Sequence, residues 1–324
     1  MFLYRLFYIV GNLFNFLLYM HLQSYSQNCK CTVANKRDRG IGMNELINFD
    51  GLGEIIVNFT NKLADGIGWI ANKETSEKLA INTYIKEIQE KDYDPVTKAA
   101  LISNAKQIIK EYCNQNDIVK IAMQSLQSDA KSENVEDDWL GRFMDRAKLV
   151  SSQEFQWIWG KILARECNKP GSIPLVLLYT LERMDKEDAE AFTALCRIAV
   201  KFEGDYAPFI IGSKLDEYKS LIGISLDKLV NLNALGLIEM NLVPLSSGYI
   251  FETEKVPNKV IYFDKEYEFS KNKYISVGNV IFTKSGQALC KSIDVDKIEG
   301  FWETYCLPFW ENNTGENALD AENE

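Results

Sequence analysis

Residues 135–166 read VEDDWLGRFMDRAKLVSSQEFQWIWGKILARE, and this stretch decides the fold expected for the chain. Its second half has apolar residues every three or four positions, which predicts an amphipathic helix. The members of this apolar stripe are Phe155, Ile158, Trp159, Ile162 and Leu163. Ser151 or Ser152 is the expected N-cap, and Pro170, Gly171 and Ser172 break the chain after the helix. The stretch therefore predicts a helical central domain.

Helical patterns precede this stretch. Residues 52–70 form an apolar stripe that either packs on the protein body or contacts a membrane or partner helix. Packing is favoured, because membrane-surface helices are rich in basic residues and the polar face here has one lysine, Lys62. Residues 74–128 predict two or three helices, with a restart at Asp94 and Pro95 and a break at residues 114–116. Residues 128–136 predict an exposed loop or linker.

The character of the chain changes after Gly204. Ser172 and Asp185 are the expected N-caps of two more helices before this point. Beyond it, residues 224–236 predict a capped helix, residues 249–252, 259–263 and 280–283 predict short strands, and residues 283–286 open a final helix. The tail from Glu311 holds five acidic residues and no base, which predicts disorder.

The predicted fold is therefore mostly α, with a multi-helix N-terminal and central domain followed by a small α+β winged-helix-like C-terminal module. The expected divisions are an apolar and basic segment (1–42), N-terminal helices (43–130), a central helical domain (131–204), the winged-helix-like module (205–296) and an acidic tail (297–324).

Charge is uneven along the chain. Residues 1–42 carry +4, so the remainder carries −14 of the net −10. An acidic body repels phosphate backbones, which argues against nonspecific nucleic-acid binding. Three interpretations of residues 1–42 stay open: a membrane anchor, a signal peptide, or translation upstream of a true start at Met43. The apolar run is shorter than the roughly 20 residues that span a bilayer.

Several chemistries are excluded by residue counts. The chain has one histidine, His21, which rules out Ser-His-Asp catalysis and HExxH zinc sites in the body. No Gly-rich phosphate loop is present. The seven cysteines are scattered and odd in number, which favours a reducing cytoplasm over a disulfide framework. We expect no enzyme activity, no cofactor and no bound metal.

Polar and aromatic residues of the central stretch form the candidate interaction surface. Its members are Asp137, Asp138, Trp139, Glu154, Gln156, Trp157 and Glu166. The acidic pair fits either a carboxylate site or, as we favour, the acidic first turn of a helix. Trp157 and Trp159 diverge on a helix, so Trp157 is either an exposed interface anchor or covered by the N-terminal helices. Glu154 and Glu166 are too far apart to share a metal and are expected to pair with lysine or arginine.

The chain resembles the bacterial domain-of-unknown-function 2806 family over roughly residues 65–293. The residues that carry the central resemblance are Asp137, Asp138, Trp139, Phe143, Val150, Ser151, Glu154, Gln156, Trp159, Lys161, Ile162, Leu163, Ala164, Glu166, Pro170, Gly171, Ser172, Asp188, Ala189, Phe192 and Leu195. The resemblance implies a helical domain followed by a winged-helix-like end and implies no reaction. The chain is also distantly similar to abortive-infection alpha-type proteins of phage defence, mainly around Gly66 and Trp69.

Three functions follow as hypotheses. The first is a cytoplasmic, non-enzymatic interaction or regulatory protein that binds a protein partner or itself. The second is a winged-helix regulator that binds nucleic acid through residues 205–296. The third is a phage-defence effector that associates with a membrane through residues 1–70. Only Lys228 is basic between Ser225 and Leu235, where a recognition helix would present arginine or lysine, so the first is favoured.

Overall fold

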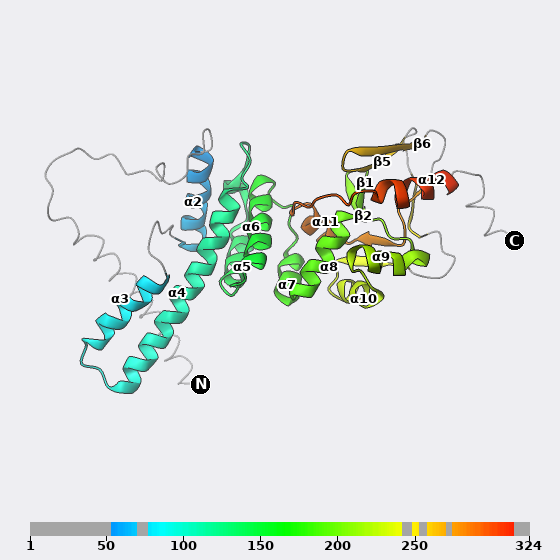
Figure 1. The fold of residues 1–324 in the computed structure, drawn as a ribbon. Coiled ribbons are helices and arrows are strands. Elements are labelled where there is room, and N and C mark those ends of the chain that lie inside the picture. Colours follow the sequence, from blue (N-terminus) through cyan, green and yellow to red (C-terminus); the bar gives the residue numbers. More distant parts are fainter. Residues whose placement is uncertain (1–52, 70–76, 242–247, 253–257, 270–273, 314–324) are drawn as a thin grey trace, which may run out of the picture. The chain divides into compact units, whose positions relative to one another are not determined.

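The structure is a computed structural model that describes residues 53–69, 77–241, 248–252, 258–269 and 274–313. Element labels are those of Figure 1. Helix α6, Gln153–Asn168, is the predicted central helix. Ser152 is its N-cap, and the Ser152 hydroxyl accepts a hydrogen bond from the Phe155 amide, as expected for a serine cap. The predicted stripe is buried on α6 at Ile158, Trp159, Ile162 and Leu163, with Phe155 half-buried.

Helix α4, Pro95–Met123, packs alongside α6 (Figure 1). Asp94 caps it and Pro95 occupies its first turn, as predicted. The predicted break at residues 114–116 is wrong, because α4 runs through it. The side-chain amide of Asn114 donates to the Lys148 carbonyl at 2.7 Å, and that of Gln115 donates to the Met144 carbonyl at 3.0 Å. These tertiary hydrogen bonds satisfy the polar side chains that would otherwise compete with the helix backbone.

Three further helices pack around this pair. In helix α5, Asp137–Ala147, the rings of Trp139 and Phe143 are stacked with their centroids 5.2 Å apart. The Phe143 ring centroid lies 5.1 Å from that of Trp159 in α6. Helix α2, Gly53–Ile67, packs on α5 and on the short 3-10 turn η2, Ser132–Asn134, with Phe59 fully buried. The prediction that this apolar stripe packs on the protein body is thereby confirmed. Helix α3, Glu77–Gln89, packs on α4.

The loop before α5 is more firmly anchored than its polar sequence predicts. Its residues 128 and 129 are exposed as expected, but Ser132 and Val135 are buried. The Lys131 amide also donates to the Cys167 carbonyl at the end of α6, at 2.9 Å. The loop is therefore part of the packed helical structure.

Helices α7, Leu175–Arg183, and α8, Lys186–Arg197, follow α6. Asp185 caps α8 as predicted and forms a reciprocal capping box with Asp188. The prediction that Ser172 caps α7 is wrong, because Pro174 holds the N-cap position. The Ser172 hydroxyl instead donates to the Arg165 carbonyl at 3.4 Å.

The C-terminal part combines small antiparallel sheets with short helices. The largest sheet has the order β2-β1-β5-β6, built from Asp205–Pro208, Ala199–Phe202, Asn258–Tyr262 and Lys265–Phe269. Strand β3, Ile238–Met240, pairs with β8, Val280–Phe282, and β4, Ile250–Glu252, pairs with β7, Tyr274–Ser276. The strands predicted at 249–252, 259–263 and 280–283 are confirmed. The helices here are α9 (Leu215–Ile222) after the 3-10 turn η3 (Gly212–Lys214), α10 (Leu226–Ala234) and α11 (Lys284–Cys290).

The chain ends in an aromatic cluster. A π-helical turn, Trp302–Cys306, leads into α12, Leu307–Asn313. Trp310 is buried and donates from its indole nitrogen to the Ser276 carbonyl at 2.9 Å. The prediction of disorder from Glu311 is therefore wrong for residues 311–313, while residues 314–324 lie outside the described part of the chain.

The fold class is as predicted, mostly helical with a small α+β region at the C-terminal end. The described residues belong to one compact unit. Strand β1, which precedes the predicted boundary at 204, pairs with β5 beyond it. The divisions at residues 130, 204 and 296 stay a prediction, and those at 1–42 lie outside the described residues. None of the described helices has the length and apolar character needed to cross a membrane.

Candidate functional site

The turn at residues 170–173 is built by two residues of the candidate surface. Glu166 is 3% exposed, and its two carboxylate oxygens accept hydrogen bonds from the amides of Gly171 at 2.6 Å and Ile173 at 2.8 Å. The indole nitrogen of Trp139 donates to the Ile173 carbonyl at 3.1 Å. Glu166 and Trp139 thus form hydrogen bonds with the backbone N–H and C=O of Ile173, respectively. We call residues 170–173 the signature turn.

Burial dominates the electrostatics of Glu166. It raises the pKa of the Glu166 carboxyl, while the hydrogen bonds from the Gly171 and Ile173 amides act in the opposite direction. The expectation that Glu166 pairs with lysine or arginine is wrong, because backbone amides are its hydrogen-bond partners. The reason is position: the end of α6 points this side chain at the turn that leaves the helix.

Gln156 also has a structural role. Its side chain is buried, and its amide nitrogen donates to the Val150 carbonyl at 3.0 Å and to the Asn114 side-chain oxygen at 3.4 Å. Gln156 therefore connects α6 to α4 and to the loop before α6. It is not available to a partner on the protein surface.

The acidic residues at the start of α5 form ion pairs. Asp137 lies 2.7 Å from the Lys62 ammonium of α2, and Asp138 lies 2.9 Å from Arg142 one turn along α5. Both occupy the first turn of the helix, where negative charge is favourable. The described residues contain no group of three histidine, cysteine, aspartate or glutamate side chains placed to hold a metal ion.

Glu154 and Trp157 lie on the outer side of α6. Trp157 is 37% exposed and has the Lys161 ammonium 5.5 Å from its ring, whereas Trp159 is 1% exposed. The predicted divergence of the two tryptophans is confirmed. Glu154 accepts a hydrogen bond from the Ser152 hydroxyl at 2.7 Å, which lowers its pKa, and lies 3.8 Å from Lys186 as expected. Of the seven candidates, Trp139 and Glu166 meet at the signature turn, and the other five do not join them.

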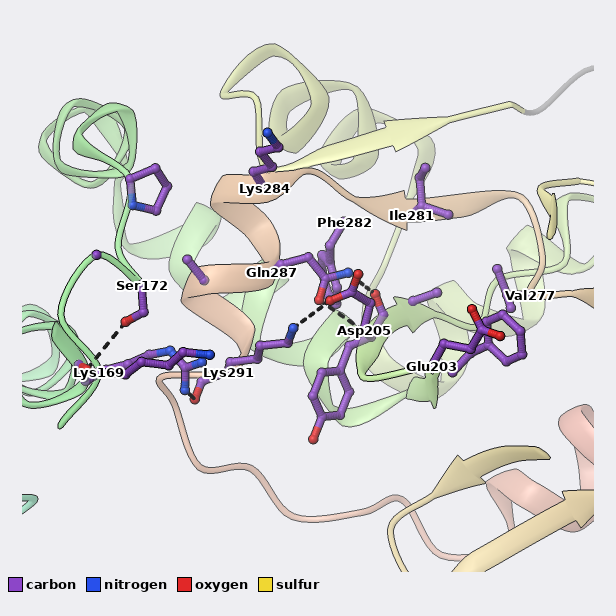
Figure 2. Close-up of a pocket in the computed structure, with 17 residues that line it drawn as sticks. Lys169, Ser172, Glu203, Asp205, Val277, Ile281, Phe282, Lys284, Gln287 and Lys291 are labelled. Atoms are coloured by element: carbon purple, nitrogen blue, oxygen red, sulfur yellow. Dashed lines mark hydrogen bonds and ion pairs between the residues drawn. The ribbon is translucent and has the colours of Figure 1, made fainter. Parts of the chain in front are cut away.

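A cavity that the sequence did not reveal lies beside the signature turn (Figure 2). Its volume is about 630 Å³, within the range of small-molecule sites. The end of α6 and the signature turn form one side, strands β1, β2 and β8 form another, and α11 completes it. A second cavity of about 280 Å³ shares three basic residues with the first: Arg165, Lys169 and Lys291.

Arg165 lines both cavities. One terminal nitrogen of its guanidinium donates to the Lys291 carbonyl at 2.8 Å. Its Nε–H is buried and has no hydrogen-bond partner in the described part of the protein. Burial lowers the pKa of Arg165. A buried donor without an acceptor costs about 1–3 kcal/mol, so this arginine is placed at an energetic cost.

Other charges complete the cavity. The Lys291 ammonium pairs with Asp205 at 2.6 Å, and Lys161 pairs with Asp294 at 2.8 Å in the smaller cavity. Figure 2 shows Lys169 on one side of the larger cavity and Glu203 on the other. Arg165 and Lys169 at the end of α6 and Lys284 at the start of α11 form no ion pair with the described residues, so the cavity lining carries unpaired positive charge in an acidic protein.

Gln287 of α11 fixes the strand wall of the cavity. Its side-chain oxygen accepts from the Tyr206 amide at 3.0 Å, and its nitrogen donates to the Tyr206 carbonyl at 2.5 Å. Sequence reasoning missed Arg165 and Lys169 because basic residues in a last helical turn are ordinary. Gln287 carries no recognisable signal either, since its partner is 81 residues away.

A second exposed feature lies on α10. Leu226 and Val230 are each 48% exposed and lie one turn apart on one face, while Leu229 and Leu232 are fully buried on the other. Asp227 is exposed beside them and Lys228 is half-buried. This face, which we call the α10 face, is apolar at its centre and lacks the arginine and lysine of a nucleic-acid reader.

The buried cysteines have the character of packing residues. Burial and the neighbouring Cys290 thiol raise the pKa of Cys196, and burial raises the pKa of Cys167 to about 12. Both are therefore neutral thiols at physiological pH, which is the unreactive form. Cys167, Cys196 and Cys290 are buried as free thiols and pack like small hydrophobic residues, whereas Cys113 is half-buried.

Comparison with known proteins gives one match. The family model described as Protein of unknown function (DUF2806) matches residues 103–304, which include the signature turn, the cavity and the α10 face. No curated protein and no solved structure matches the chain. Since the family model covers more than half of the sequence, the chain belongs to the DUF2806 family.

Proposed function

We propose that the protein is a non-catalytic interaction or regulatory protein whose α10 face binds another protein. The observation that carries the proposal is the exposure of Leu226 and Val230 on adjacent turns of α10. Apolar side chains at the centre of a surface with a polar rim are typical of protein interfaces. We further propose a cytoplasmic location, supported by the free cysteines at residues 113, 167, 196, 290 and 306.

The elements around α10 support a module that presents one helix. Helix α8, strand β2, helices α9 and α10 and strands β3 and β8 occur in the order of a winged helix, with strands β4 to β7 between β3 and β8 in the sequence, where a wing would be. Such modules bind either nucleic acid or protein through the second helix of the pair. The α10 face favours protein, because residues 205–292 hold ten acidic residues and ten lysines and only Lys228 is basic on α10.

The partner's chemistry follows from the charges that flank the face. Asp227 lies in the first turn of α10, next to Leu226 in the sequence, and is exposed. A partner with an apolar centre and a basic rim would complement this surface. A second copy of a chain with net charge −10 fits less well, so we propose a different protein as the partner.

The test is a site-specific crosslink in the native host. A photoreactive amino acid is placed at position 226 or 230, and at position 190 on the exposed side of α8 as the control. We expect one protein, with a basic contact surface, to crosslink from positions 226 and 230 and not from 190. Leu226→Ser with Val230→Ser should abolish its co-purification. Nucleic acid crosslinked from these positions would instead support the winged-helix alternative, and equal labelling from position 190 would contradict the proposal.

The membrane-associated alternative has less support among the described residues. Phe59 and Leu63 of α2, which form the centre of its apolar stripe, are fully buried in the protein. Residues 1–52, on which this alternative also rests, lie outside the described part.

A further inference from the structure

We propose that the cavity beside the signature turn binds a small organic phosphate, a phosphomonoester whose phosphate lies at Arg165 and Lys169. This inference goes beyond the proposed protein interaction and concerns a different surface. It rests on the convergence of basic side chains from α6 and α11 in a cavity of ligand size, within a chain whose net charge is −10.

The charge at the α6 end fits a phosphate dianion. Asp205 neutralises Lys291, which leaves the guanidinium of Arg165 and the ammonium of Lys169 without a carboxylate partner among the described residues. A phosphomonoester carries about −1.5 to −2 charge at neutral pH, which matches these two cations. A single carboxylate would leave one of them uncompensated.

The geometry of Arg165 is suited to the same group. One terminal nitrogen is held by the Lys291 carbonyl, which fixes the plane of the guanidinium. The Nε–H lies on the opposite edge and has no acceptor in the described structure. That edge is the side-on fork with which arginine binds phosphate oxygens in pairs. This donor is enclosed in the structure, so a phosphate oxygen reaches and satisfies it only when the side chains around it move.

The rest of the cavity fits a neutral body attached to the phosphate. Ile281 and Phe282 of β8, with Pro174 after the signature turn, give it apolar walls. Glu203 lies on the side away from Lys169 (Figure 2), where a carboxylate accepts from the hydroxyl or amino groups of a sugar or base. The volume of about 630 Å³ accommodates a molecule of nucleotide size.

Binding would connect two parts of the chain. Arg165 and Lys169 belong to α6 and its end, whereas Glu203, Phe282 and Lys284 belong to the sheets and to α11. A ligand that contacts both sides would stabilise their packing. The cavity is therefore suited to signalling the presence of a metabolite to the C-terminal module.

The test uses isothermal titration calorimetry on the full 324-residue chain at constant ionic strength, with adenosine monophosphate, inorganic phosphate and adenosine as probes. We expect saturable 1:1 binding of the monophosphate, weaker binding of inorganic phosphate and none of adenosine. Inorganic phosphate binding as tightly as the monophosphate would overturn the organic part of the proposal. The absence of saturable binding of both, up to about 10 mM, would overturn it entirely.

Two variants locate the site. Lys169→Gln should weaken the binding of the monophosphate about tenfold, which is the order expected for the loss of one charge-assisted contact. Arg165→Gln should weaken it further, and its melting temperature reports whether loss of the Lys291 contact unfolds the protein. Lys186→Gln removes another exposed lysine, on α8, and should bind the monophosphate as the unchanged protein does. If Lys169→Gln binds the monophosphate as tightly as the unchanged protein does, the phosphate is not bound in this cavity.

Discussion

The signature turn and the cavity beside it share a border but differ in how their polar groups are satisfied. At the turn, the carboxylate of Glu166 and the indole of Trp139 bind the backbone of residues 171 and 173. In the cavity, Arg165 keeps a buried Nε–H without a partner. The residues that make the sequence recognisable therefore build the structure, and the residues left with unused hydrogen-bonding capacity lie next to them. A specific sequence motif identified the fold here, while the candidate site is recognised from its cavity and the unpaired cations that line it.

The largest expected effect distinguishes the two tryptophans Trp139 and Trp157 of the central stretch. Trp139→Ala should lower the free energy of unfolding by about 3–5 kcal/mol, because it removes a buried ring and leaves the Ile173 carbonyl without its donor. Trp157→Ala, at a position 37% exposed, should change it by less than about 1 kcal/mol. Urea denaturation followed by circular dichroism measures both. Similar losses would mean that Trp157 is as structural as Trp139.

Two glycines within helices, Gly160 and Gly141, differ in how closely neighbouring atoms approach them. A Cβ on Gly160 of α6 would lie 2.5 Å from Ile121 Cγ2 and 3.0 Å from the Ile118 carbonyl oxygen, whereas none of the described atoms lies within 4 Å of one on Gly141 of α5. Gly160→Ala should therefore destabilise the protein by about 1–3 kcal/mol through overpacking between α4 and α6. Gly141→Ala should stabilise it by up to about 1 kcal/mol through helix propensity. Thermal unfolding distinguishes them, and a stable Gly160→Ala variant would contradict the close approach.

Glu166 tests whether the signature turn depends on its carboxylate. Glu166→Gln should cost about 1–3 kcal/mol, because one of the two amides loses its acceptor. The pKa of Glu166 is raised in the folded protein, so the folded state binds a proton more readily than the unfolded state. The stability from this protonation is present below the unfolded pKa and is lost as pH rises through the folded pKa.

The difference in the free energy of unfolding between the unchanged protein and Glu166→Gln should accordingly be larger at pH 5 than at pH 8. Urea denaturation at the two pH values measures it. A difference that grows with pH would mean that the amide hydrogen bonds outweigh burial and lower this pKa instead.

The smallest stability effect is expected on the α10 face. Leu226→Ser with Val230→Ser should change the free energy of unfolding by no more than about 0.5 kcal/mol per site, since both side chains are half in solvent. The same pair of substitutions should abolish partner binding. Leu229→Ser, which alters a fully buried neighbour, is the matched control and should unfold the module. A large stability loss from the exposed pair would show that these residues pack against the protein itself.

Local sequence determined the helices and their caps. Asp94, Ser152, Asp185 and Thr283 each begin a helix, because a cap needs only a short polar side chain and the amides two or three residues further on. The opposite directions of Trp157 and Trp159 likewise follow from helical geometry alone. These features could be predicted because their causes lie within one turn of the residue.

The tertiary structure decided the features with distant partners. Helix α4 runs through Asn114 because the side chain of Asn114 donates a hydrogen bond to the Lys148 carbonyl, 34 residues away. Arg165 lines the cavity with one guanidinium nitrogen hydrogen-bonded to the Lys291 carbonyl, 126 residues away. Periodicity and capping describe neighbours along the chain and contain no information about such pairs. The sequence by itself thus determined the helical class, the DUF2806 resemblance and the chemistries excluded by a single histidine. Only the folded chain brought the basic ends of α6 and α11 together beside the signature turn, because that juxtaposition depends on packing between segments over 100 residues apart.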